Sequence, residues 1–156
     1  MKESGKADSA LKLYQRFTLA LLFPPLMSFF SGVVALFNTD YAQGLALNAM
    51  VYSGDQIKNR SGYIAFVLVV GLALVGLGVL LTLRAAKGKL YAVILGLAAY
   101  LADFIFGFIV YSSSFGNAFI IRIICHGIFL ILMGAALFFY FFASKRLKEE
   151  KMPPKN

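Results

Sequence analysis

Three ionisable side chains lie within otherwise apolar stretches of this chain: Asp103, Arg122 and His126. A charged group inside a bilayer costs from about 3 kcal/mol upward, so such residues are by default candidates for a functional site. An imidazole titrates near neutral pH, and a carboxylate beside it can help it to hold and release a proton. These residues therefore predict a proton- or ion-linked site, to which Ser28 and Ser31 add hydroxyl groups.

The expected depths place the acid and the imidazole opposite each other. With a rise of 1.5 Å per residue, Asp103 lies about 12 Å below the outer end of its apolar segment. On the next segment His126 lies about 10 Å below the same surface, and Arg122 about 4–5 Å below it. We therefore expect Asp103, His126, Arg122, Ser28 and Ser31 to form one buried polar pocket that opens outward.

Two other interpretations of the same residues remain open. A hydrogen bond between Asp103 and His126 would simply lock two helices together, at about 0.6 kcal/mol on average. Alternatively, one carboxylate and one imidazole could serve as general acid and base in an enzyme that acts on lipid. The chain has a single Cys and a single His, and it contains no phosphate-binding loop or nucleophile elbow. We therefore predict no enzyme, no catalytic residue, no cofactor and no metal site.

Four apolar segments must position these side chains: 17–37, 63–83, 90–111 and 119–143. The 156 residues are 60% hydrophobic and only 14% charged, whereas soluble domains carry about 25% charged residues. Each segment reaches the roughly 20 residues that a helix needs to cross a bilayer. We predict an all-α, polytopic membrane protein, a four-transmembrane-helix antiparallel bundle in one domain over 1–156, with the lipid bilayer as its first partner.

The basic residues indicate the orientation. They gather in the tails 1–16 and 144–156 and in the turn 84–89, and an excess of Lys and Arg marks the cytoplasmic side of a membrane. We expect cytoplasmic N- and C-termini in a cell membrane, the bacterial inner membrane in particular, with anionic lipid headgroups as possible ligands of the tails. The tails lack the interleaved aromatic side chains of a nucleic-acid platform, so no nucleic acid is expected.

Local patterns refine the expected helices. The Pro24-Pro25 pair predicts a kink in the first segment because proline lacks a backbone donor. Residues 41–52 of the long first connection are moderately apolar and predict a short helix on the outer surface. A stripe of small residues around the acid predicts that one face of the third segment packs against protein. The stripe consists of Ala92, Gly96, Ala99, Asp103 and Gly107.

Residues 89–110 carry Gly96, Tyr100 and Asp103 at spacings of four and three, and His126 and Gly134 follow. This arrangement over 89–134 resembles uncharacterised small prokaryotic four-helix membrane proteins with an Asp in the third span and a His in the fourth. The resemblance implies that the acid and the imidazole are shared features, and it implies no mechanism. We therefore expect a structural or interaction subunit, as a homo-oligomer or with a partner membrane protein. The alternative is a proton- or ion-linked small-solute carrier.

Overall fold

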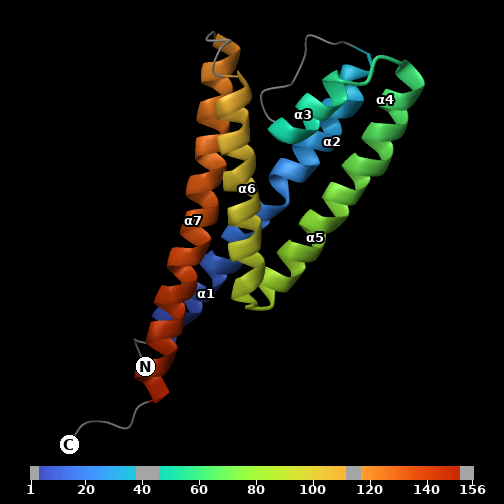
Figure 1. The fold of residues 1–156 in the computed structure, drawn as a ribbon. Helices are drawn as coiled ribbons and strands as arrows, with labels where there is room; N and C mark the ends of the chain where they lie inside the picture. Colours follow the sequence, from blue (N-terminus) through green and yellow to red (C-terminus); the bar gives the residue numbers. More distant parts are fainter. Residues whose placement is uncertain (1–3, 38–45, 112–116, 152–156) are drawn as a thin grey trace, which may run out of the picture.

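The computed structural model describes residues 4–37, 46–111 and 117–151, and the regular structure in these ranges is helical. The helices are α1 (Ser4–Phe17), the 3₁₀ helix η1 (Thr18–Leu21), α2 (Phe23–Ala35), α3 (Asn48–Asp55), α4 (Arg60–Phe66), the π-helix η2 (Val67–Gly71), α5 (Leu72–Ala86), α6 (Leu90–Tyr111) and α7 (Asn117–Lys151). They form an elongated bundle in which α6 and α7 lie side by side (Figure 1).

Four helical stretches are long and apolar enough to cross a membrane, which confirms the predicted number. They are Ser9–Ala35, Arg60–Ala86, Leu90–Tyr111 and Arg122–Lys145. The third coincides with the predicted segment 90–111, whereas the first and second begin earlier than 17 and 63. An all-helical chain with four such stretches is the class of protein that the composition predicted.

Much of the two basic tails is helical in the described part of the chain. Helix α1 begins at Ser4 and α7 continues to Lys151. The reason is visible in α1, where Ala10, Tyr14 and Phe17 recur at helical spacing and give the segment an apolar face. That face packs against α7, so the N-terminal segment is an integral part of the bundle.

Aromatic side chains hold α1 in place. Tyr14 is fully buried, and its hydroxyl donates a 2.6 Å hydrogen bond to the carbonyl oxygen of Ala85. The Tyr14 ring meets Tyr140 of α7 edge to face at 5.3 Å, and the rings of Phe17 and Phe139 stack at 5.4 Å. These contacts continue into a dry core between α1, η1, α5, α6 and α7. We call this region of the bundle the turn end, because the α5–α6 turn at 87–89 closes it.

The first candidate span is broken just before its two prolines. Helix η1 ends at Leu21, and α2 begins at Phe23 with Pro24 in its first turn. A proline in the first turn removes no intrahelical hydrogen bond, because the first backbone N–H groups of a helix have no intrahelical acceptor. The chain changes direction at this point (Figure 1), so the predicted kink takes the form of a new helix start.

Helix α3 lies among the spans and not on the outer surface as expected. It sits beside α2 and α6 (Figure 1), and its residues Asn48, Met50 and Gly54 are buried. Its first turn carries polar groups whose partners come from other helices, and these bonds hold the segment inside the bundle. The end of the bundle that contains α3 and α4 is called the α3 end below.

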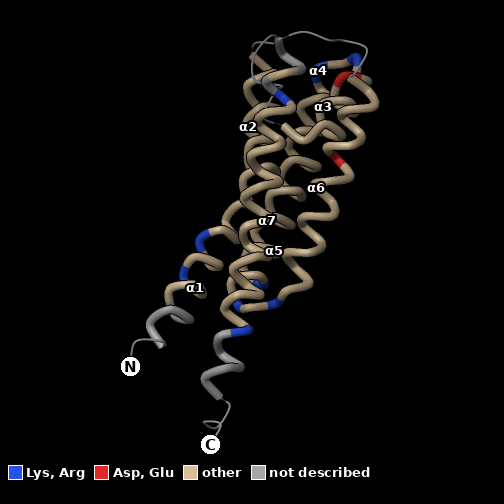
Figure 2. Tube along the Cα trace, turned by 90° about the vertical axis from the view of Figure 1, so that its left-hand side faces the viewer, with Lys and Arg blue, Asp and Glu red and all other residues tan. Residues whose placement is uncertain are grey.

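The charged residues are distributed unevenly along the bundle (Figure 2). Basic residues predominate at the turn end, where Figure 2 shows only Lys and Arg among the coloured charges, whereas Asp55, Lys58 and Arg60 give the α3 end both signs. Asp103 of α6 and Arg122 of α7 both reach the first turn of α3 through hydrogen bonds. These two charged side chains therefore meet at the α3 end.

Candidate functional site

The Asp103 carboxylate caps the first turn of α3. Its Oδ2 accepts hydrogen bonds from the backbone N–H of Asn48 at 3.0 Å and from the Asn48 side-chain amide at 3.1 Å. Its Oδ1 accepts from the backbone N–H of Ala49 at 2.9 Å. Leu47 occupies the N-cap position of α3 and has no side-chain acceptor. The acid of α6 therefore supplies the capping oxygens and the negative charge that favour a helix N-terminus.

Asn48 connects three helices and is almost fully buried, with 2% of its surface exposed. Besides Asp103 Oδ2, its amide nitrogen donates to the backbone carbonyl oxygen of Asp103 at 3.1 Å. Its amide oxygen accepts from the Arg122 guanidinium of α7 at 3.2 Å. Arg122 also lies over the Tyr111 ring, 4.1 Å from its centroid. The amide thus separates the acid from the guanidinium and bonds to both.

Gly107 makes room for this contact. A Cβ atom on Gly107 would overlap the side-chain amide of Asn48, so the close approach of α3 to α6 depends on the missing side chain. The small-residue stripe of the third segment therefore faces protein at this position, as predicted. It lies one turn beyond Asp103 on the same face of α6.

Ser28 of α2 secures the segment from the other side. Its hydroxyl donates to the Pro24 carbonyl oxygen at 2.7 Å and accepts from the Leu47 backbone N–H at 2.7 Å. Asp103, Ser28 and Arg122 thus bind three consecutive residues, 47–49, from three different helices. We call Ser28, Asn48, Asp103 and Arg122 the polar cluster. It acts as a clamp on the start of α3.

His126 of α7 is buried and binds Tyr100, which lies about one helical turn before Asp103 on α6. The Tyr100 hydroxyl and His126 Nδ1 are 2.9 Å apart, and the two rings stack at 5.3 Å with an angle of 3° between their planes. His126 is 1% exposed, and its Nε2 has no hydrogen-bond partner within the described residues.

The expected direct Asp103–His126 pair is therefore wrong in its detail. In the described part of the chain the acid bonds to Asn48 and Ala49, and the imidazole bonds to Tyr100. The physical reason is the rotation and the register of α6 and α7 relative to each other. Tyr100 precedes Asp103 by three residues on the same face of α6. A small shift of α7 along its axis, relative to the expected register, therefore places His126 beside the Tyr100 hydroxyl and not beside the carboxylate. The structure does bring Ser28, Asp103 and Arg122 together around α3.

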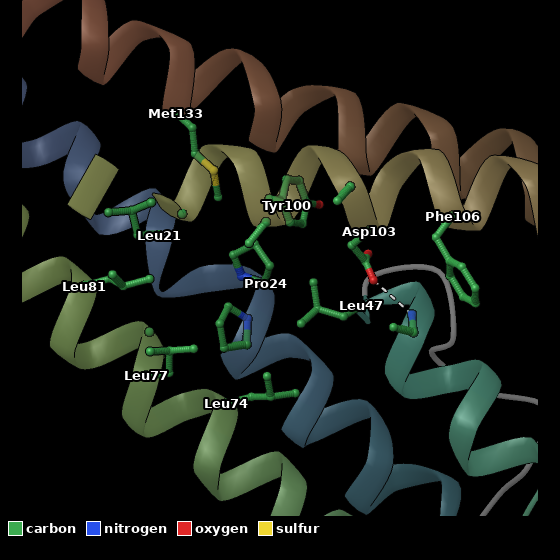
Figure 3. A pocket seen from close by; sticks show the side chains of 16 residues that line it. Leu21, Pro24, Leu47, Leu74, Leu77, Leu81, Tyr100, Asp103, Phe106 and Met133 are labelled. Atoms are coloured by element: carbon green, nitrogen blue, oxygen red, sulfur yellow. Dashed lines mark hydrogen bonds between the residues drawn. The ribbon is translucent and has the colours of Figure 1, made fainter. Parts of the chain in front are cut away.

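An apolar crevice adjoins the clamp. Its volume is about 410 Å³, and residues of α2, α5 and α6 form most of its walls. Figure 3 shows Leu21 and Leu81 toward one end and Asp103 and Phe106 toward the other. At the sides, Leu77 is 51% exposed and Ala99 is also exposed, so the crevice opens laterally between α5 and α6. Among the described residues of its lining, Asp103 is the only charged one.

A second, smaller cavity lies on the other side of the Ser28–Leu47 hydrogen bond. It holds about 30 Å³ and is lined by Ser28, Ser31, Ala46 and Asp55 among others. This is the volume of about one water molecule. Burial raises the pKa of the Asp55 carboxyl above its ordinary 3.8, and the nearby Arg122 charge acts in the opposite direction. The predicted residue Ser31 belongs to this cavity and not to the polar cluster.

The sequence interpretation missed two residues of the site. Asn48 lies in the long connection, where no periodic pattern indicated a buried position. Tyr100 was visible as part of the spacing Gly96, Tyr100 and Asp103, and its position three residues before the acid was the available signal. Within the described residues there is no group of three His, Cys, Asp or Glu that could hold a metal ion.

Comparisons with known proteins give no relative for this chain: no family model, no curated protein and no solved structure matches it. The chemistry of the clamp and the crevice is thus the basis for a function.

Proposed function

We propose that this chain is a non-enzymatic integral protein of the cell membrane that binds a small lipid-soluble molecule in its lateral crevice. Its four candidate spans form an antiparallel bundle, with the turn end and both termini cytoplasmic and the α3 end outside. The basic charges of the turn end support this orientation, and they also suit contact with anionic lipid headgroups. In this view the protein is an interaction subunit.

The crevice is the observation that carries the proposal. Its volume of about 410 Å³ falls within the roughly 300–1,000 Å³ of small-molecule sites, which are concave and mostly apolar. Its rim residues Leu77 and Ala99 are exposed and lie midway along their spans. A molecule dissolved in the acyl chains can therefore reach it from the side without crossing the polar ends of the bundle.

The clamp gives the crevice its shape. Leu47 and Ala49 line it, and both are held by the polar cluster through their backbone N–H groups. Figure 3 shows the Asp103 carboxylate pointing from α6 to this part of the chain. Non-helical backbone is tolerated at membrane depth where it is buried in protein or lines a cavity. The fixed first turn of α3 therefore forms one end of a preformed site.

Photo-crosslinking with a fatty alcohol that carries a diazirine tests the proposal. We expect labelled peptides from the crevice walls of α5 and α6 in membranes containing the full-length protein. Ala99→Phe fills the crevice and should abolish this labelling. Ala98→Phe is the matched control, because Ala98 is also exposed but does not line the crevice. Equal labelling of both variants would show that the alcohol contacts only the outer surface.

Cysteine labelling tests the orientation. In a Cys125→Ser background, a membrane-impermeant maleimide applied to intact cells should modify Gln56→Cys at the α3 end. It should modify Lys87→Cys in the α5–α6 turn only after the cells are opened. Both positions are exposed in the structure, so accessibility from the two sides of the membrane is the remaining variable. The reverse pattern contradicts the proposed topology.

A proton- or ion-linked carrier is the second candidate, and the two cavities favour it. Ser28 lines the smaller cavity while Pro24 and Leu47, its hydrogen-bond partners, line the crevice. Movement of α3 would therefore connect the two spaces. Proton flux in proteoliposomes tests this candidate, with Asp103→Asn and His126→Ala as variants. Flux that neither substitution changes excludes a carrier that uses these residues.

A further inference from the structure

The Asp103 carboxylate has capacity for one more hydrogen bond on the crevice side. Two carboxylate oxygens offer about four acceptor positions, and among the described residues Asn48 and Ala49 occupy three of them. Within the same part of the chain Oδ1 holds a single bond, from the Ala49 N–H, and Asp103 and Ala49 both line the crevice. A donor on a bound molecule can therefore complete the coordination of Oδ1.

The charge of this carboxylate is only partly compensated. In the described ranges, its hydrogen-bond donors are three neutral N–H groups, and the N-terminus of a helix contributes the equivalent of about half a positive charge. Arg122 bonds to the Asn48 amide oxygen, on the other side of that amide from the acid. An apolar crevice with a carboxylate at one end therefore complements a positively charged group better than a neutral or negative one.

Aromatic rings flank the acid along the same face of α6. Tyr100 and Phe106 lie three residues before and after Asp103, and all three line the crevice. Figure 3 shows these three side chains along one wall, opposite Pro24 and Leu47. A cation near an aromatic face gains about 0.5–2 kcal/mol, so the rings add to the preference for positive charge.

We propose that the crevice takes a cationic amphiphile. The protonated amine binds Asp103 Oδ1 between Tyr100 and Phe106, and the alkyl body lies along the apolar walls toward Leu21. The distance from Phe106 to Gly96 along α6 is about 15 Å at 1.5 Å per residue, which suits one alkyl chain of moderate length. This inference rests on the proposed function and adds the chemical class of the ligand.

Binding of two matched probes tests the inference. Tritiated dodecylammonium and tritiated dodecanol share one tail, and the amine is protonated at pH 7 because alkylamines titrate near 10. Saturable binding is measured by scintillation proximity on full-length protein in nanodiscs of zwitterionic lipid. We expect the wild type to bind the ammonium at least about tenfold more tightly, the scale of one charge-assisted hydrogen bond. Asp103→Asn should remove this preference, so that dodecylammonium and dodecanol bind the variant within about twofold of each other.

The other outcomes are informative in different ways. Equal affinity of the wild type for both probes overturns the inference and leaves the proposed crevice intact. Absence of saturable binding of either probe, with Ala99→Phe identical to wild type, overturns the proposed function as well.

Asp103→Asn also alters the cap of α3, so loss of binding of both probes in this variant would report a deformed crevice. Asp103→Glu then decides, because it restores the charge at the same helix position. An ammonium preference in Asp103→Glu supports the inference, and its absence there overturns it. Asn48→Ala controls for the loosened clamp: it removes the amide but keeps the carboxylate, so the preference for ammonium should persist.

Discussion

The two ends of this bundle are held together by different forces. At the turn end, α1 is fixed by buried rings and small side chains, with Tyr14 fully buried among them. At the α3 end, Ser28 and Asp103 accept five hydrogen bonds from residues 47–49, beside a hollow of about 410 Å³. Packing supplies the rigidity of the first region, whereas hydrogen bonding leaves the second with space for a ligand.

This contrast has an energetic consequence. Large buried side chains are worth about 3–5 kcal/mol when truncated to alanine, whereas interhelical hydrogen bonds in membranes average about 0.6 kcal/mol. The turn end should therefore dominate global stability, and the α3 end should dominate local opening and binding. The following substitutions test that division.

The largest loss of stability is expected for Tyr14→Ala. It removes a fully buried ring and its hydrogen bond to the Ala85 carbonyl oxygen, and we expect unfolding in mixed micelles to become easier by about 3–5 kcal/mol. Tyr91→Ala is the control, because Tyr91 is 50% exposed and should cost far less. Similar losses for both tyrosines would show that α1 does not anchor the bundle.

Asp103→Ala is expected to lower the global free energy of unfolding by less than Tyr14→Ala does, but to loosen α3 strongly. The variant leaves the first N–H groups of α3 without their acceptor, which costs about 1–3 kcal/mol. Hydrogen–deuterium exchange should rise over α3 (Asn48–Asp55) and stay unchanged at the turn end. The double variant with Asn48→Ala should lose less than the sum of the two single losses. Uniformly raised exchange, or strict additivity, contradicts the clamp.

The hydrogen bond at the turn end can be separated from the packing there. Tyr14→Phe keeps the ring but removes the donor to the Ala85 carbonyl oxygen, and we expect a loss of about 1 kcal/mol in the same unfolding assay. The ratio of this loss to that of Tyr14→Ala measures how far packing outweighs hydrogen bonding. A loss as large as that of Tyr14→Ala would reverse the comparison.

The smallest effect concerns Asp55 and pH. Because burial raises its pKa, the folded chain holds the proton more tightly than the unfolded chain does. Stability should therefore fall as pH rises from the ordinary value of 3.8 through the raised value, and level off above it. Asp55→Asn should remove this part of the pH dependence of the thermal midpoint. A wild-type midpoint that rises over the same interval contradicts the sign.

The fold was predictable in the features that hydropathy controls. The four apolar segments were found because a bilayer-length run of apolar residues has few other structures available. The lengths of α1 and α7 are less predictable, because hydropathy alone does not mark the helical ends of basic segments, and an amphipathic helix such as α1 can carry both a basic face and Tyr14. The break before Pro24 was foreseeable from the missing donor alone.

The site was only half predictable, for geometric reasons. The stripe around Asp103 indicated a protein-facing acid, and the structure places that acid against α3. Its partner Asn48 lies in a connection with no periodicity, so no helix face could be assigned to it. The partner of Asp103 is Asn48 and not the predicted His126 because of how the helices are rotated about their axes. A change of one residue in the register of a helix turns its side chains by about 100°. No hydropathy pattern specifies that angle.

The long sequence separation within the clamp has a consequence for biosynthesis. The donors at 48 and 49 meet their acceptor 55 and 54 residues later, and Arg122 follows 74 residues after Asn48. At about 5–20 residues per second, the ribosome needs roughly 3–11 s to reach the acid after it has made the donors. During that interval the amides of Asn48 and Ala49 lack their native acceptor. The clamp can therefore close only after α6 has been synthesised.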